Sequence, residues 1–190
     1  MKQVQKIRNT KETKIQLSLS PNGGEININT KIGFFDHMLN ALAKHAGLGL
    51  TLVCDGDVEV DFHHSVEDCG IVLGEALAEA IYPLQNAERF GDSVVVMDEA
   101  ATACAVDLGG RAFLVFEGEF GGKIGEFDAQ LIEEFFRALA FNAKITLHLS
   151  LLRGKNDHHK AEAAFKAFAV ALRRAVAFRD CGVPSTKGCI

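Results

Sequence analysis

The sequence contains no tryptophan, one tyrosine and only five cysteines in 190 residues. The odd number of cysteines and the lack of a C-x-x-C pair favour a reducing cytosol over a disulfide framework. No run of apolar residues approaches the roughly 18 that are needed to span a bilayer. The first six residues lack the apolar core of a signal peptide. These absences predict a cytoplasmic protein that has no membrane partner.

An excess of positive charge is also absent. The chain has 20 Lys and Arg against 25 Asp and Glu, a net charge of -5 and a pI of about 5.8, so nothing in the charge balance favours nucleic acid. What is present is 48% hydrophobic residues, among them 14 phenylalanines, which suit the filling of a core and of subunit contacts. The composition is that of a globular chain long enough to bury a substantial core.

Strand and helix patterns follow one another twice along the chain. In the first half, alternation predicts strands at 14–19, 25–30 and 48–53, and helical patterns cover 34–46 and 63 to about 85. The Pro21-Asn22-Gly23-Gly24 turn predicts that the first two strands form a hairpin. In the second half, the patterns predict strands at 101–108, 112–116 and 145–152, and helices at 128–143 and 157 to about 179.

Both halves therefore have the order ββαβα. We expect an α+β fold in which the helices of each half cover one face of its sheet. No long linker or low-complexity segment separates the halves. The sequence thus predicts a single domain over residues 1–190, built from two repeats at about 1–92 and 93–190.

The motif His-His-x-x-Glu opens the last helix of each half. It reads His63-His64-Ser65-Val66-Glu67 in the first copy and His158-His159-Lys160-Ala161-Glu162 in the second. Because residues three and four apart share a helix face, we expect the second histidine to converge with the glutamate and the first to lean elsewhere. One copy alone is a weak signal, but its recurrence at the same helical phase favours metal binding. In the first copy, Ser65 and Asp68 also have the spacing of a helix capping box.

Aligning the two motifs places His37 opposite Glu134 on equivalent helices. We therefore predict two ions with mixed ligands. The first would take His37, His64, Glu67 and His158, and the second His63, Glu134, His159 and Glu162. Imidazole and carboxylate ligands without thiolate suit manganese, iron or zinc, and they disfavour calcium and copper(I).

These motifs, with Phe34-Phe35-Asp36-His37-Met38-Leu39 and Phe165-Lys166-Ala167, resemble the imidazoleglycerol-phosphate dehydratase family of histidine biosynthesis. The similarity extends from Arg8-Asn9-Thr10-Lys11-Glu12-Thr13 to Ser185-Thr186-Lys187-Gly188. The resemblance implies a lyase with two Mn²⁺ ions per active site and a duplicated fold like that of ribosomal protein S5 domain 2. It also implies a homo-oligomer of 24 subunits whose active sites lie between subunits. Many members have histidine where this chain has Glu134, and a carboxylate also ligates manganese well.

The implied reaction converts D-erythro-imidazoleglycerol phosphate to imidazole-acetol phosphate and water. The hydrogen that is removed is not next to a carbonyl, so direct abstraction would be very difficult. If both ring nitrogens bind metal, the ring can become an imidazolate and expel the adjacent hydroxyl to give a diazafulvene. Loss of the neighbouring proton then yields an enol, which ketonises.

The resemblance also implies roles for residues outside the metal sites. Glu12 matches a glutamate that contacts substrate and is expected to transfer the proton, with His45 as a second catalytic residue. The residues implied in binding substrate or its phosphate are Arg89, Arg111, Lys166, Ser185 and Lys187. Arginine can clamp phosphate in a bidentate fork, and lysine acts as a point charge. Without the family, Glu12 would be taken for an exposed carboxylate at a strand start.

Three other functions are compatible with paired histidines. A dinuclear hydrolase usually holds its ions about 3.5–4 Å apart with bridging carboxylates, and this chain lacks a clear cluster of bridging aspartates. A di-iron helical bundle uses Glu-x-x-His pairs in an all-helical sequence, whereas strands are evident here. The third function is metal binding that only holds subunits together, without catalysis. It is compatible with the dehydratase, because ions between subunits would serve both purposes.

Overall fold

The computed structural model describes residues 2–180, 182, 184 and 185. The first half contains β1 (Val4–Asn9), β2 (Thr13–Ser20), β3 (Ile26–Asn29), α1 (Gly33–Ala46), β4 (Gly49–Gly56) and α2 (His63–Ile81). The second contains β5 (Phe90–Met97), β6 (Ala100–Asp107), β7 (Phe113–Glu117), β8 (Lys123–Ile124), β9 (Phe127–Asp128), α3 (Leu131–Ala143), β10 (Thr146–Arg153) and α4 (Asp157–Ala175). The predicted α+β class and the duplication are confirmed. Each half begins with one more strand than the patterns indicated, β1 and β5.

The sheet topology corrects the predicted hairpin between 14–19 and 25–30. The strand order is β1-β2-β4-β3 in the first half and β5-β6-β10-β7 in the second. Strand β4 lies between β2 and β3, antiparallel to the former and parallel to the latter. The hairpins are instead formed by β1 with β2 and by β5 with β6. Alternation alone does not reveal this, because β3 and β4 are parallel neighbours joined through α1 in a crossover.

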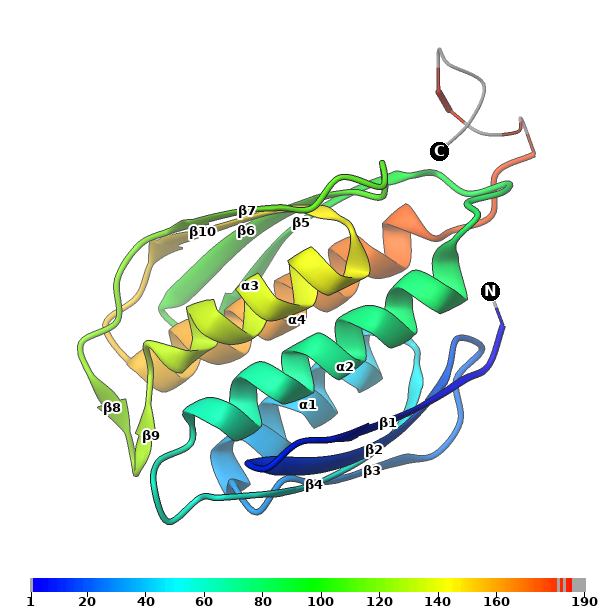
Figure 1. Ribbon diagram of the computed structural model, residues 1–190. Helices are drawn as coiled ribbons and strands as arrows, with labels where there is room; N and C mark the ends of the chain where they lie inside the picture. The colour runs from blue at the N-terminus through cyan, green and yellow to red at the C-terminus, as the bar shows by residue number, and fades with distance from the viewer. Residues whose placement is uncertain (1, 181, 183, 186–190) are drawn as a thin grey trace.

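The helices of both halves lie between the two four-stranded sheets, as Figure 1 shows for the described part of the chain. Helix α2 packs along α3, and α1 packs along α4. On α2, a Cβ atom added at Gly70 would lie 2.8 Å from the carbonyl oxygen of Phe135, and one at Gly74 would lie 2.6 Å from that of Leu139. Glycine at these two positions therefore allows the close approach of α2 and α3.

Several phenylalanines are fully buried in the core, most of them on α3 and α4. Phe35, Phe135, Phe136, Phe165 and Phe168 are all less than 2% exposed. The rings of Phe136 and Phe165 have centroids 4.8 Å apart, and Phe35 meets Phe135 at 5.4 Å in an edge-on contact. Burial of such large rings stabilises the core, and the contact of Phe35 with Phe135 joins the two halves. The expectation that phenylalanine fills the core is confirmed.

Some helix ends differ from the predicted ones. Helix α2 ends at Ile81 rather than near Gln85, because Pro83 follows and Tyr82 has an extended backbone with ψ 147°. Helix α3 begins at Leu131 and α4 ends at Ala175. The predicted capping box is also wrong: α2 begins at His63 and has no side-chain cap, and Asp68 bonds elsewhere.

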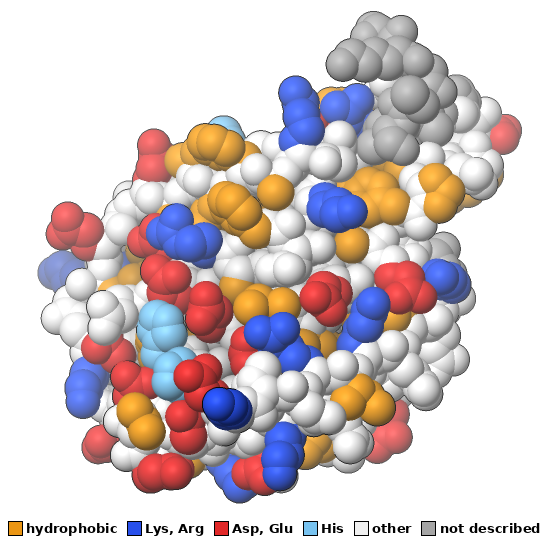
Figure 2. All heavy atoms as spheres, viewed as in Figure 1, with side chains coloured by type: hydrophobic (Ala, Val, Ile, Leu, Met, Phe, Trp, Pro, Cys, Tyr) orange, Lys and Arg blue, Asp and Glu red, His pale blue; other side chains and the backbone are white. Residues whose placement is uncertain are grey.

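The helices of both halves begin at the same end of the molecule (Figure 1). This end carries His37 near the start of α1, His63 at the start of α2, Glu134 in the first turn of α3 and His158 in the first turn of α4. The duplication therefore brings the predicted metal ligands of both halves to one end. Figure 2 shows histidine side chains surrounded by acidic ones over the start of α2.

Candidate functional site

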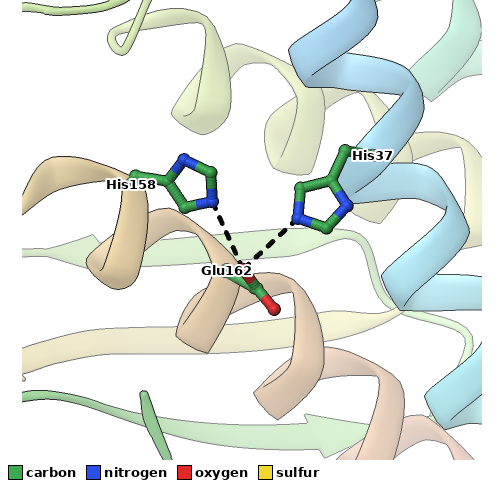
Figure 3. A group of neighbouring side chains, drawn as sticks. All are labelled: His37, His158 and Glu162. Atoms are coloured by element: carbon green, nitrogen blue, oxygen red, sulfur yellow. Dashed lines mark hydrogen bonds and ion pairs between the residues drawn. The ribbon is translucent and has the colours of Figure 1, made fainter. Parts of the chain in front are cut away.

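His37, His158 and Glu162 form a compact group of metal-binding side chains. One ligand atom from each lies within 4.8 Å of the others. The Nε2 atoms of His37 and His158 are both 3.3 Å from the same oxygen, Oε2 of Glu162 (Figure 3). Two imidazoles and one carboxylate that converge in this way fit a divalent ion such as manganese, iron or zinc.

The local sequence explains how the group is built. Asn156 caps α4 by accepting hydrogen bonds from the backbone N–H groups of His158 and His159. With the helix started there, His158 and Glu162 are four residues apart and share a face. The ring of Phe34 packs edge-on against His158, with centroids 5.2 Å apart. The side chains that converge are therefore the first histidine and the glutamate of the motif, which corrects the predicted pairing of the second histidine.

Glu162 is held as a carboxylate inside this group. It is only 7% exposed, and its Oε1 atom lies 2.6 Å from Nζ of Lys166. Burial opposes ionisation, but Lys166 and His37 outweigh it and lower the pKa of Glu162. The group therefore offers a negative oxygen to a cation near neutral pH.

A looser, related group lies between α2 and α3. The Nε2 atom of His63 is 3.8 Å from Oε2 of Glu67, again the first histidine and the glutamate of a motif. His63 and Glu134 border a hollow of about 510 Å³, and Glu67 and Glu134 border a smaller one. Glu134 itself lies 3.5 Å from Arg137. By the duplication, His63, Glu67 and Glu134 correspond to His158, Glu162 and His37.

Within the single chain, His37 lies with His158 as the predicted division between two ions has it, but Glu162 joins them instead of Glu67. Glu162 lies with His37 and His158, not with His63 and Glu134. Glu67 lies beside His63. The division assumed that the second histidine shares a face with the glutamate, but both motifs use the four-residue spacing.

The second histidine of each motif points to a different carboxylate. The Nδ1 atom of His64 is 3.0 Å from Asp57, and that of His159 is 2.7 Å from Glu99. These contacts raise the pKa of His64 and of His159. Glu99 also accepts hydrogen bonds from the backbone N–H groups of Asn156 and Lys155, and these bonds together with His159 lower its pKa to about 2. A carboxylate at Nδ1 leaves Nε2 available as a ligand atom.

Glu12 lies close to one of these histidines. It occupies the turn between β1 and β2, and its Oε1 atom is 3.8 Å from Nε2 of His64. His45 is in the last turn of α1, where burial and then the charge of Lys166 lower its pKa. The structure thus brings Glu12 to a predicted metal ligand and His45 to the electrostatic field of Lys166.

The predicted phosphate-binding arginines gather at the opposite end of α4. Arg89 donates two hydrogen bonds to Asp107, at 2.6 and 3.1 Å, and Arg111 lies 3.6 Å from the same carboxylate. The backbone N–H of Arg89 donates to the carbonyl of Ala175, the last residue of α4. Nη1 of Arg89 donates to the carbonyl of Pro184, next to Ser185. Lys187 lies outside the described residues.

These two groups of residues are far apart within one chain. His158 and Ala175 are 17 positions apart on one helix, and a rise of 1.5 Å per residue gives a separation of about 25 Å. A small substrate cannot reach both the histidine group and the arginines of the same subunit.

Comparison with known proteins identifies the family. A family model described as imidazoleglycerol-phosphate dehydratase matches residues 30–172. The chain belongs to this family. Dehydratases with that name from Campylobacter hominis and Aliarcobacter butzleri are 65% and 58% identical to it, over 97% and 95% of this chain and 98% and 96% of theirs.

Two solved structures of the same family have a similar fold. The imidazoleglycerol-phosphate dehydratase of Staphylococcus aureus has a TM-score of 0.84 at 40% identity, covering 94% of this chain and 99% of that one. The dehydratase of Pyrococcus furiosus in complex with (S)-C348 has a TM-score of 0.86 at 35% identity, covering 97% and 100%. The protein is a hydro-lyase of histidine biosynthesis, as its family and relatives indicate. Among the described helices, none is long and apolar enough to cross a membrane.

The structure of this dehydratase adds residues that the sequence did not single out. Asp57 and Glu99 contact the second histidines, and Asp107 holds both arginines. Asp57 and Glu99 lie at or next to turns, without a periodic pattern to distinguish them from neighbouring acidic residues such as Asp55 and Asp98. The repeat offered one signal: Glu12 and Glu99 each precede the second strand of their half by one residue.

Proposed function

We propose that this dehydratase converts D-erythro-imidazoleglycerol phosphate to imidazole-acetol phosphate and water with two Mn²⁺ ions per active site. The observation that carries the proposal is the convergence of His37 and His158 on Glu162 in a chain of this family. The looser group of His63, Glu67 and Glu134 supports a second ion, because the duplication makes it the counterpart of the first.

The residues of the chain divide into those that hold the ring and those that move the proton. Two bound ions would supply Lewis acidity at the two nitrogens of the imidazole ring. His64 and His159, with Nδ1 held by carboxylates, would offer Nε2 as further ligands. Glu12 would take the proton from the carbon chain, and His45 would assist from the end of α1.

The separation of about 25 Å along α4 supports active sites shared between subunits. The arginines of one chain would bind the phosphate of a substrate whose ring is held by another chain. Exposed apolar side chains on the sheets, Ile7, Val94, Val96 and Phe113 among them, offer surfaces for subunit contacts. We propose that these contacts build the 24-subunit homo-oligomer.

The substrate's phosphate would be bound by Arg89, Arg111, Ser185 and Lys187, with Lys166 near the ring. Arg111 is the freer of the two arginines, because its side chain is 77% exposed and that of Arg89 is 15% exposed. The free thiols Cys54, Cys69 and Cys104 are buried, and this fits the proposed cytoplasmic location.

The direct test is turnover of imidazoleglycerol phosphate by metal-stripped protein before and after addition of Mn²⁺. The proposal predicts that activity returns with manganese and that the bound metal saturates near two ions per subunit. Full turnover by stripped protein, or saturation at one ion with full activity, would contradict it.

A further inference from the structure

Asp68 joins two sequence motifs that are far apart along the chain. It lies on α2, five residues after His63, and is 6% exposed. Its Oδ1 atom accepts a hydrogen bond of 2.9 Å from Nε of Arg8, and its Oδ2 atom accepts one from the hydroxyl of Thr13. Arg8 is near the end of β1 and Thr13 begins β2. One buried carboxylate therefore holds both strands on either side of the turn that carries Glu12.

The turn itself is closed by hydrogen bonds around Glu12. The hydroxyl of Thr10 accepts hydrogen bonds from the backbone N–H groups of Glu12, at 3.1 Å, and of Thr13, at 2.9 Å. The carbonyl of Glu12 accepts a hydrogen bond of 3.1 Å from the backbone N–H of Asp57. Both backbone polar groups of Glu12 are thus engaged, which leaves only its side chain free to move.

The second half shows that the fold does not need this network. Ala100 begins β6 as Thr13 begins β2, and Ala163 follows His158 by five residues as Asp68 follows His63. Both alanines are buried, at 1% and 0% exposure. Two small apolar side chains thus occupy the positions that make the polar contact in the first half, although the strand order and the helices correspond. A buried ion pair is weak evidence of a stabilising role by itself.

The equivalent glutamates also differ. Glu99, the counterpart of Glu12, is fixed through its carboxylate by the N–H groups of Lys155 and Asn156. The side chain of Glu12 is 54% exposed, and its Oε1 atom lies 3.8 Å from Nε2 of His64. The placement of its carboxylate therefore depends on the backbone of the turn.

We propose that Asp68, with Arg8 and Thr13, positions Glu12 for proton transfer. The inference rests on the proposed role of Glu12 as the acid/base group. Asp68 is a positioning residue, because it acts through the turn and does not touch the substrate. Helix α2 also carries the predicted metal ligands His63, His64 and Glu67. One helix therefore fixes the position of the proton-transfer group relative to these ligands.

The test is a double-mutant cycle with Thr13→Val and Glu12→Gln in the manganese-loaded oligomer. Thr13→Val removes the hydroxyl that donates to Asp68 and also lies 3.2 Å from the hydroxyl of Thr10, and it keeps the shape of the side chain. We expect kcat to fall about tenfold or more, as for a catalytic group displaced by a fraction of an ångström. KM and metal content should stay unchanged, and the pH profile of kcat should shift. Thr13→Ser, which keeps the hydroxyl, should restore kcat and the profile.

In the Glu12→Gln background, Thr13→Val should have almost no further effect on kcat, because coupled residues are non-additive. Thr102→Val is the matched control, since the hydroxyl of Thr102 is buried without a hydrogen-bond partner among the described residues. It should leave kcat and the pH profile unchanged. Arg8→Met repeats the cycle from the more exposed end of the network if Thr13→Val does not fold.

An equal fall in kcat with and without Glu12 would overturn the inference and leave the proposed function intact. A Glu12→Gln variant with normal turnover would instead remove the proton-transfer role of Glu12, and the inference with it.

Discussion

The Nε2 atom of His37 lies 3.3 Å from Oε2 of Glu162, although the two residues are 125 positions apart. His37 is on α1 of the first half and Glu162 is on α4 of the second. The duplicated fold exchanges one ligand between its halves, since Glu134 of the second half likewise lies near His63 and Glu67 of the first. Neither half holds a complete group by itself.

Replacement of Glu162 by glutamine should weaken metal binding. The change keeps the size of the side chain but removes the negative oxygen that faces both imidazoles. We expect the affinity for Mn²⁺ to fall by at least about tenfold, because even the loss of a group that only supports a ligand costs that much. Titration calorimetry on the stripped protein measures it. Glu75→Gln, an exposed position on α2, is the control, and an unchanged affinity in Glu162→Gln would exclude Glu162 as a ligand.

Replacement of Glu12 by glutamine should separate catalysis from assembly. Loss of a general acid/base group lowers turnover by about 10²–10⁴-fold. Glu12 is in an exposed turn, so the oligomer and its metal content should remain as in the unaltered protein. Steady-state kinetics and light scattering give the two readouts. Normal turnover would show that another group moves the proton.

Arg89 and Arg111 should respond differently to substitution by alanine. Arg89 is 15% exposed and bonded to Asp107, so its loss leaves a largely buried carboxylate with only Arg111 beside it and should cost about 2 kcal/mol of unfolding free energy. Arg111 is 77% exposed, so its loss should change stability little. Arg111→Ala should instead weaken phosphate-bearing ligands far more than imidazole itself. Equal weakening of both ligands would contradict its assignment to the phosphate.

Removal of metal should dissociate the oligomer. The ligand histidines must be neutral to bind an ion, so a chelator or acid releases the metal and breaks any contact that the ion makes between subunits. Sedimentation velocity before and after chelation, with Mn²⁺ added back, measures the change. An oligomer that stays whole after complete removal of metal would show that apolar contacts alone hold it together.

The sequence predicted where most strands and helices lie, but it did not predict which strands pair with each other in the sheets. Alternation identified β2 and β4, yet it did not show that β4 separates β2 from β3, because strand pairing is decided by tertiary packing. Strand β1 was not predicted, since among its residues only Val4 is buried and the alternation is weak.

Helical geometry gave part of the candidate site. The motif spacing indicated that a histidine and a glutamate would meet. Residues three and four apart both share a helix face, so only the structure shows that the first histidine of each motif lies beside the glutamate. Asp57 had no signal in the sequence, and Glu99 had only its repeat position, because the folded chain is what brings them to His64 and His159.

The most direct test of shared active sites mixes two inactive variants. Glu162→Gln removes a residue of the histidine group, and Arg111→Ala removes one at the other end of α4. After separate chelation, the two are combined and reassembled with Mn²⁺. If one chain holds the ring and another the phosphate, intact sites should reappear and restore up to about a quarter of normal turnover at equal mixing. Turnover no greater than the sum of the two variants would contradict the account.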